Sequence, residues 1–139
     1  MLMATMVCTV TWQIFTRFIL HNPSLYTEEM AGFLLIWIGM LGSSYALFTR
    51  SHVGIDILTK KFSGYKKVVS EVLIYSLIII YSLFVLIIGG SKLVIITFTL
   101  RQLSPALGIS MGYIYLVIPI TGILMITISL DFIKKTIKK

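Results

Sequence analysis

The stretch that decides the fold is residues 26–52, YTEEMAGFLLIWIGMLGSSYALFTRSH. An uncharged run of 20 residues, from Met30 to Thr49, separates the carboxylate of Glu29 from the guanidinium of Arg50. At about 1.5 Å per residue, a helix of this length spans roughly 30 Å, which is the thickness of the hydrocarbon core of a bilayer. The two polar ends of this stretch are therefore predicted to lie at opposite faces of a membrane.

The whole chain has the composition of an integral membrane protein. Of its 139 residues, 58% are hydrophobic and only 12% are charged, and the mean hydropathy is +0.99. A soluble domain of this size could not bury so much apolar surface. The single cysteine, Cys8, excludes an intramolecular disulfide and a cysteine-rich metal site.

Basic residues gather in two places, each beside an apolar run. Nine of the 12 lie in one loop or in the C-terminal tail: Arg50, Lys60, Lys61, Lys66, Lys67, Lys134, Lys135, Lys138 and Lys139. This excess is typical of the cytoplasmic side of membrane proteins. The net charge of +7 therefore indicates topology and contact with anionic membrane lipids, not binding of nucleic acid.

The hydropathy pattern predicts an all-α membrane protein with a single domain over residues 1–139. Four transmembrane helices are expected, at about residues 2–20, 30–49, 68–100 and 111–133. With both basic clusters in the cytoplasm, both termini lie inside and the chain is a multi-pass protein of the plasma (inner) membrane. Apolar residues among lysines in the segment 53–62 could form a short amphipathic helix along the cytoplasmic interface.

The third and fourth helices are expected to be irregular. Residues 68–100 would span about 50 Å as one helix, so this segment must tilt, break or protrude. The sequence GGSK at residues 89–92 is the expected break, and a strongly tilted helix is the alternative. In the fourth helix, Pro119 should free the carbonyl of Tyr115 and kink the helix.

Polar residues mark the outer end of the second helix. Thr27 is predicted to cap the helix, with Glu28 and Glu29 in its first turn, where carboxylates favour the positive end of the helix dipole. Arg17, near the outer end of the first helix, is expected to reach the interface or to form a structural pair with one of these carboxylates.

Small residues of the second helix fall on one face, at offsets of 0, 7, 11 and 14: Gly32, Gly39, Ser43 and Ala46. Small side chains let a second helix approach closely, because lipid gives helices little hydrophobic reason to associate. The neighbouring helix could belong to this protein's own bundle or to a partner subunit, and the sequence leaves both alternatives open.

The residues do not favour an enzyme or a self-sufficient transporter. His52 and Asp56 lie four residues apart and would share a helix face, which favours a structural hydrogen bond because a third metal ligand is missing. The middles of all four predicted helices lack acidic and basic residues, whereas ion and substrate sites need polar groups at membrane depth. A small self-associating exporter is the alternative, but it would need a carboxylate in the first helix, and residues 2–16 contain none.

Four short segments in register resemble the small membrane subunit of tripartite ATP-independent periplasmic (TRAP) transporters, the DctQ-like family. They are WQIFTRF at 12–18, YTEE at 26–29, RSHVGID at 50–56 and SPALGIS at 104–110, followed by Tyr115 and Pro119. Two departures from the family pattern are the missing lead before the first helix and Tyr26, where a tryptophan is more usual.

The resemblance implies an accessory role beside a larger, elevator-type membrane subunit that holds the sodium and substrate sites. It also implies a periplasmic binding protein that delivers an organic acid, such as a C4-dicarboxylate or a sialic acid. The chain itself is then expected to hold no cofactor and to act as a scaffold. The candidate subunit-interface or structural residues are Arg17, Glu28, Glu29, Gly32, Gly39, Ser43, Arg50, His52, Asp56, Ser104 and Pro105.

Overall fold

The computed structural model describes residues 1–21, 24–49 and 65–137, and most of these residues are helical. In chain order the elements are α1 (Leu2–Phe18), α2 (Leu25–Phe48), α4 (Tyr65–Tyr81), η1 (Ser82–Gly89), α5 (Gly90–Thr99), α6 (Met111–Tyr115) and α7 (Val117–Ile137). The described residues hold one isolated β-bridge, between Leu103 and Ser110, and no strand. The all-helical expectation is confirmed.

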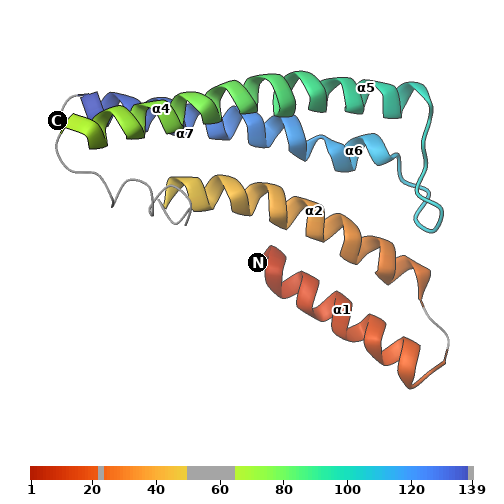
Figure 1. Ribbon diagram of the computed structural model, residues 1–139. Coiled ribbons are helices and arrows are strands. Elements are labelled where there is room, and N and C mark those ends of the chain that lie inside the picture. Colours follow the sequence, from red (N-terminus) through yellow and green to blue (C-terminus); the bar gives the residue numbers. More distant parts are fainter. Residues whose placement is uncertain (22–23, 50–64, 138–139) are drawn as a thin grey trace.

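The helices lie side by side in a row rather than around a central axis (Figure 1). Within the described residues, α1 contacts only α2, α2 in turn packs on α7, and α7 packs on α4 and η1. Such a row leaves wide apolar faces uncovered. Even in the best covered of the candidate membrane spans, only 33% of the apolar window is buried within the chain.

Three helices of the described residues are long and apolar enough to cross a membrane: Leu25–Phe48, Lys66–Thr99 and Met111–Thr136. Helix α1 has 17 residues and is therefore about 26 Å long, somewhat shorter than the hydrocarbon core. That α1 forms a fourth span, and that both termini lie in the cytoplasm, stay predictions.

Helix α2 begins earlier than the sequence pattern predicts. Its N-cap is Ser24, in extended conformation and without a side-chain cap, and the hydroxyl of Thr27 donates to the Ser24 carbonyl over 2.9 Å. The predicted Thr27 cap is therefore wrong, because Leu25 and Tyr26 already belong to the helix. Glu28 lies in the first turn, and Glu29 follows it one position deeper in the helix.

The predicted break at residues 89–92 is also wrong. Gly90 has helical dihedral angles (φ −62°, ψ −42°), and the helix continues into α5. The glycine serves close packing instead, because a Cβ on Gly90 would lie 2.8 Å from Cγ2 of Ile118. The irregular part is the π-helical η1, and the continuous span Lys66–Thr99 is about 51 Å long, so it must tilt or protrude.

The expected irregularity near Pro119 is present. The last helix is interrupted at Leu116, between α6 and α7, one turn before the proline. Proline lacks an N–H group and its ring crowds the carbonyl four residues earlier, which is that of Tyr115. Just beyond, Gly122 brings α7 against η1, because a Cβ there would lie 2.9 Å from the Cβ of Leu86.

The core lies along α7, with α2 on one side and α4 and η1 on the other. Its buried residues are Leu47, Tyr75, Leu86 and Met125. Tyr75 stacks on Phe132 of α7, with ring centroids 5.3 Å apart. Nearer the C-terminal end of α7, the hydroxyl of Thr136 donates to the Glu71 carboxylate of α4 over 3.1 Å.

Candidate functional site

The loop between α5 and α6 has a defined start. Two amides close the end of α5, those of Arg101 and Gln102, which donate to the carbonyls of Phe98 and Thr97 over 3.1 Å each. This pair of bonds is a Schellman motif, which needs a left-handed residue after the helix. Arg101 takes that conformation (φ 47°) although it is not a glycine. The chain therefore turns sharply away from α5.

The loop then folds back on itself. The amide of Ser104 donates to the Ile109 carbonyl, and the amide of Gly108 donates to the Ser104 carbonyl, both over 2.9 Å. Gly108 has a φ of 67°, a backbone conformation that side chains disfavour. The result is a compact turn at residues 104–108 that lies beside the N-terminal end of α2.

The carboxylate of Glu29 holds this turn in place. It accepts hydrogen bonds from the hydroxyl of Ser104, from the amide of Ala106 over 3.1 Å and from the amide of Leu107 over 3.2 Å. Ser104 is only 2% exposed. Because an ionised carboxylate only accepts hydrogen bonds, the three converging donors satisfy most of its lone pairs. We call this arrangement the Glu29 cap, and it ties α2 to the α5–α6 loop.

A shallow depression lies beside the Glu29 cap. It has a volume of about 420 Å³ and is lined by Leu25, Glu28, Glu29, Pro105 and Ala106. Glu28 is exposed at its rim. The structure thus brings together four of the residues that the sequence singled out: Glu28, Glu29, Ser104 and Pro105.

The expected ion pair of Arg17 does not form in the described part of the chain. Arg17 is exposed at the end of α1, and the Glu29 oxygens are occupied by the α5–α6 loop. No sequence signal pointed to that partner, because Glu29 and Ser104 are 75 positions apart.

The small-residue face of α2 is largely uncovered. Nothing lies within 4 Å of a Cβ built on Gly32, Gly39 or Gly42, and all three glycines are exposed. Ser43 is half-buried and donates to the Met40 carbonyl over 2.7 Å. The described helices therefore leave Gly32 and Gly39 without a neighbour, and Gly42 is a further open position that the sequence pattern did not single out.

The remaining candidates, Arg50, His52 and Asp56, lie outside the described residues, as does the segment 53–62 with its expected interfacial helix. Their structural roles stay predictions. Elsewhere, within the residues the structure describes, no group of three or more histidine, cysteine, aspartate or glutamate side chains could hold a metal ion.

Comparison with known proteins decides the family. The family model for the DctQ component of tripartite ATP-independent periplasmic transporters matches residues 6–139. The chain belongs to this family. It is a small permease subunit of a TRAP transporter and a multi-pass protein of the inner membrane.

Three relatives are similar to this TRAP subunit over most of its length. It is 30% identical over 137 residues to the sialic acid TRAP transporter small permease protein SiaQ of Vibrio cholerae, covering 99% of this chain and 78% of that protein. A putative TRAP transporter small permease protein of Haemophilus influenzae is 26% identical over 136 residues, covering 98% and 83%. The third, the sialic acid TRAP transporter permease protein SiaT of H. influenzae, is 31% identical over 117 residues, which are 81% of this chain but only 18% of SiaT.

The Glu29 cap predicts a local loss of order when its acceptor is changed. In Glu29→Gln, the amide NH₂ group replaces one acceptor oxygen and faces backbone N–H donors. We expect the amide hydrogens of Ala106 and Leu107 to exchange severalfold faster by hydrogen–deuterium exchange. Glu28→Gln is the matched control and should leave both rates unchanged; equal rates in the two variants would contradict the cap.

Proposed function

We propose that the chain is the scaffold subunit of a sodium-coupled, binding-protein-dependent secondary transporter that imports an organic acid. In this account a larger, elevator-type membrane subunit holds the substrate and sodium sites, and this chain stabilises its stationary part. The sialic acid relatives favour a carboxylate substrate, a class that also includes the C4-dicarboxylates.

The observation that carries the proposal is the open glycine face of α2. A glycine inside a helix costs about 1 kcal/mol relative to alanine, so a helix keeps it where another backbone must come close. A Cβ on Gly90 or Gly122 would lie within 3 Å of atoms of another helix, whereas among the described residues nothing lies within 4 Å of a Cβ on Gly32, Gly39 or Gly42. A helix of another subunit would supply the missing neighbour.

Two further observations support a larger membrane subunit as the partner. SiaT contains a region similar to this chain within a much longer polypeptide, of which that region is 18%. A joined arrangement of this kind favours a partner that is itself a larger membrane protein. In addition, the buried polar side chains in the spans of the described residues are mainly hydroxyls, such as Ser44, Ser82, Thr121 and Ser129, which would serve poorly as a complete ion pathway.

The Glu29 cap gives the proposed scaffold a second task. It fixes the shape of the surface formed by the start of α2 and the α5–α6 loop, which is the periplasmic surface if the basic clusters lie inside. We propose that this surface, with the exposed Glu28, contributes to the landing site of the periplasmic binding protein.

Affinity purification of the tagged chain from native membranes tests the proposal. A larger multi-helix membrane protein should be recovered with it in mild detergent and be identified by mass spectrometry. Recovery of the chain alone, as a self-associated oligomer, would contradict the scaffold function and favour the small exporter. A tag at the C-terminus keeps the Glu29 cap and the open face of α2 unobstructed.

A further inference from the structure

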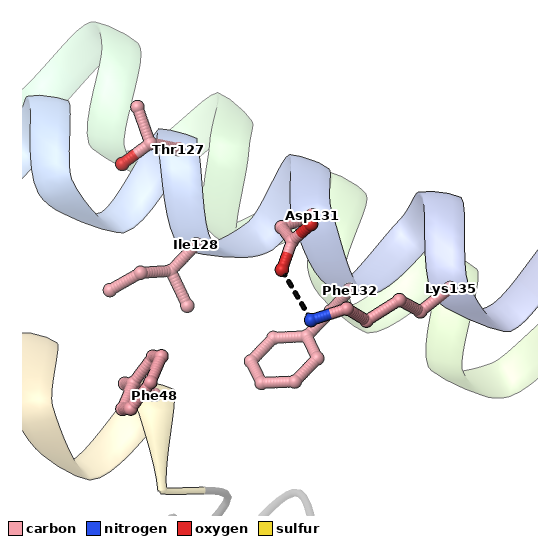
Figure 2. Close-up of a pocket in the computed structure, with 6 residues that line it drawn as sticks. All are labelled: Phe48, Thr127, Ile128, Asp131, Phe132 and Lys135. Carbon is pink, nitrogen blue, oxygen red and sulfur yellow. Dashed lines mark hydrogen bonds and ion pairs between the residues drawn. The ribbon is translucent and has the colours of Figure 1, made fainter.

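A second hollow lies far from the Glu29 cap, between the C-terminal ends of α2 and α7. It has a volume of about 360 Å³ and is lined by Phe48, Thr127, Ile128, Asp131, Phe132 and Lys135 (Figure 2). Phe48 comes from α2, and the other five residues come from α7. The proposed scaffold function makes no use of this groove, which we call the α2–α7 groove.

Apolar and charged side chains alternate along the α7 side of the groove. Phe48, Ile128 and Phe132 present hydrocarbon, and the candidate span that contains Ile128 ends at Thr136. The charged pair Asp131–Lys135 therefore lies at the depth where the hydrocarbon core gives way to lipid headgroups. A groove that offers apolar side chains together with a charge pair at this depth can hold part of one phospholipid, a segment of acyl chain against the rings and the headgroup at the charges.

The charges at the rim select the kind of headgroup. Nζ of Lys135 lies 2.7 Å from Oδ2 of Asp131, and the two side chains are 66% and 60% exposed (Figure 2). Because the pair is neutral as a whole, it offers no net attraction to an anionic headgroup. A zwitterionic headgroup can meet both charges at once, with its phosphate at Lys135 and its amine at Asp131.

The number of N–H donors distinguishes an ethanolamine headgroup, a primary amine, from a choline headgroup, a quaternary one. An ethanolamine ammonium has three N–H donors for the Asp131 carboxylate, whereas choline has none. Choline would instead need an aromatic cage. Phe132 already stacks on Tyr75, and Nζ of Lys135 lies 6.0 Å from the centroid of its ring. Among the described residues of the lining, Phe48 is therefore the one ring left for such a contact.

We infer that the α2–α7 groove binds a phosphatidylethanolamine-type lipid, with Asp131 accepting from the ammonium and Lys135 contacting the phosphate. The basic clusters predict that this lipid comes from the cytoplasmic leaflet. The inference does not depend on the large subunit, since every residue of the groove belongs to this chain.

Native mass spectrometry of the full chain, with added phosphatidylethanolamine or phosphatidylcholine of identical acyl chains, tests this inference. Phosphatidylethanolamine should bind about threefold more tightly than phosphatidylcholine, as expected for exposed charge pairs. Asp131→Asn should remove this preference while leaving the exposed helix end folded. The control Lys134→Gln changes a neighbouring basic residue outside the groove and should keep the preference.

Two outcomes would overturn the inference. They are equal binding of the ethanolamine and choline lipids to the wild-type chain, and an unchanged preference in Asp131→Asn.

Discussion

Gly122→Val is expected to remove most of the folded protein from the membrane. A Cβ at this position would lie 2.9 Å from both Cβ of Leu86 and Cγ1 of Ile87, and 3.3 Å from the backbone oxygen of Ser82. The two helices must move apart, and overpacking of this kind costs about 2 kcal/mol. The expected readout is a large fall in the yield of monodisperse protein on detergent size-exclusion chromatography.

The adjacent substitution Thr121→Val is the matched control. Thr121 is fully buried, and its hydroxyl has no hydrogen-bond partner in the described structure. Replacing an unsatisfied hydroxyl by a methyl group of similar size should be neutral or stabilising. A thermal-shift measurement should therefore find Thr121→Val at least as stable as wild type. If Gly122→Val were equally stable, the close packing of α7 on η1 would be contradicted.

Gly39→Leu is expected to separate the chain from the proposed large subunit without unfolding the chain. Nothing lies within 4 Å of a Cβ at Gly39, and leucine is a better helix former than glycine, so the isolated chain should keep its yield and helix content. In the complex, the larger side chain would occupy the space of the partner helix. Recovery of the large subunit should fall by about tenfold, which corresponds to ~1.4 kcal/mol.

Gly39→Ala is the graded control, since one methyl group is tolerated more easily at a helix contact and should cause a smaller loss. The paired readouts distinguish two kinds of failure. Loss of the folded chain in Gly39→Leu would mean that α2 packs within the chain at this position. Full recovery of the large subunit would mean that its helix lies elsewhere on the surface.

The sequence predicts those features that depend on residues close together in the chain. The apolar run before Arg50 predicts helix α2, and Pro119 predicts the interruption one turn earlier, at Leu116. The small-residue pattern at Gly32 and Gly39 also identifies a face with open space around it, although it does not tell which neighbour fills that space.

Features that depend on distant residues could not be predicted in this way. The glycines at residues 89 and 90 resemble a break, but Gly90 is needed because α7 passes close by at Ile118. Likewise, Glu29 resembles the partner of a nearby arginine, and only the path of the α5–α6 loop brings the Ser104 hydroxyl to it. Local sequence patterns identify the unusual residues, whereas the contacts of these residues follow from how the helices are arranged.

We propose that this chain supports transport without carrying it out. Sodium-gradient uptake of a labelled organic acid into proteoliposomes tests it most directly, with this chain, its large subunit and the binding protein added in all combinations. We expect no uptake by this chain alone or with the binding protein, and full uptake when all three proteins are present. Sodium-driven uptake by this chain without the large subunit would show that the chain itself transports the acid.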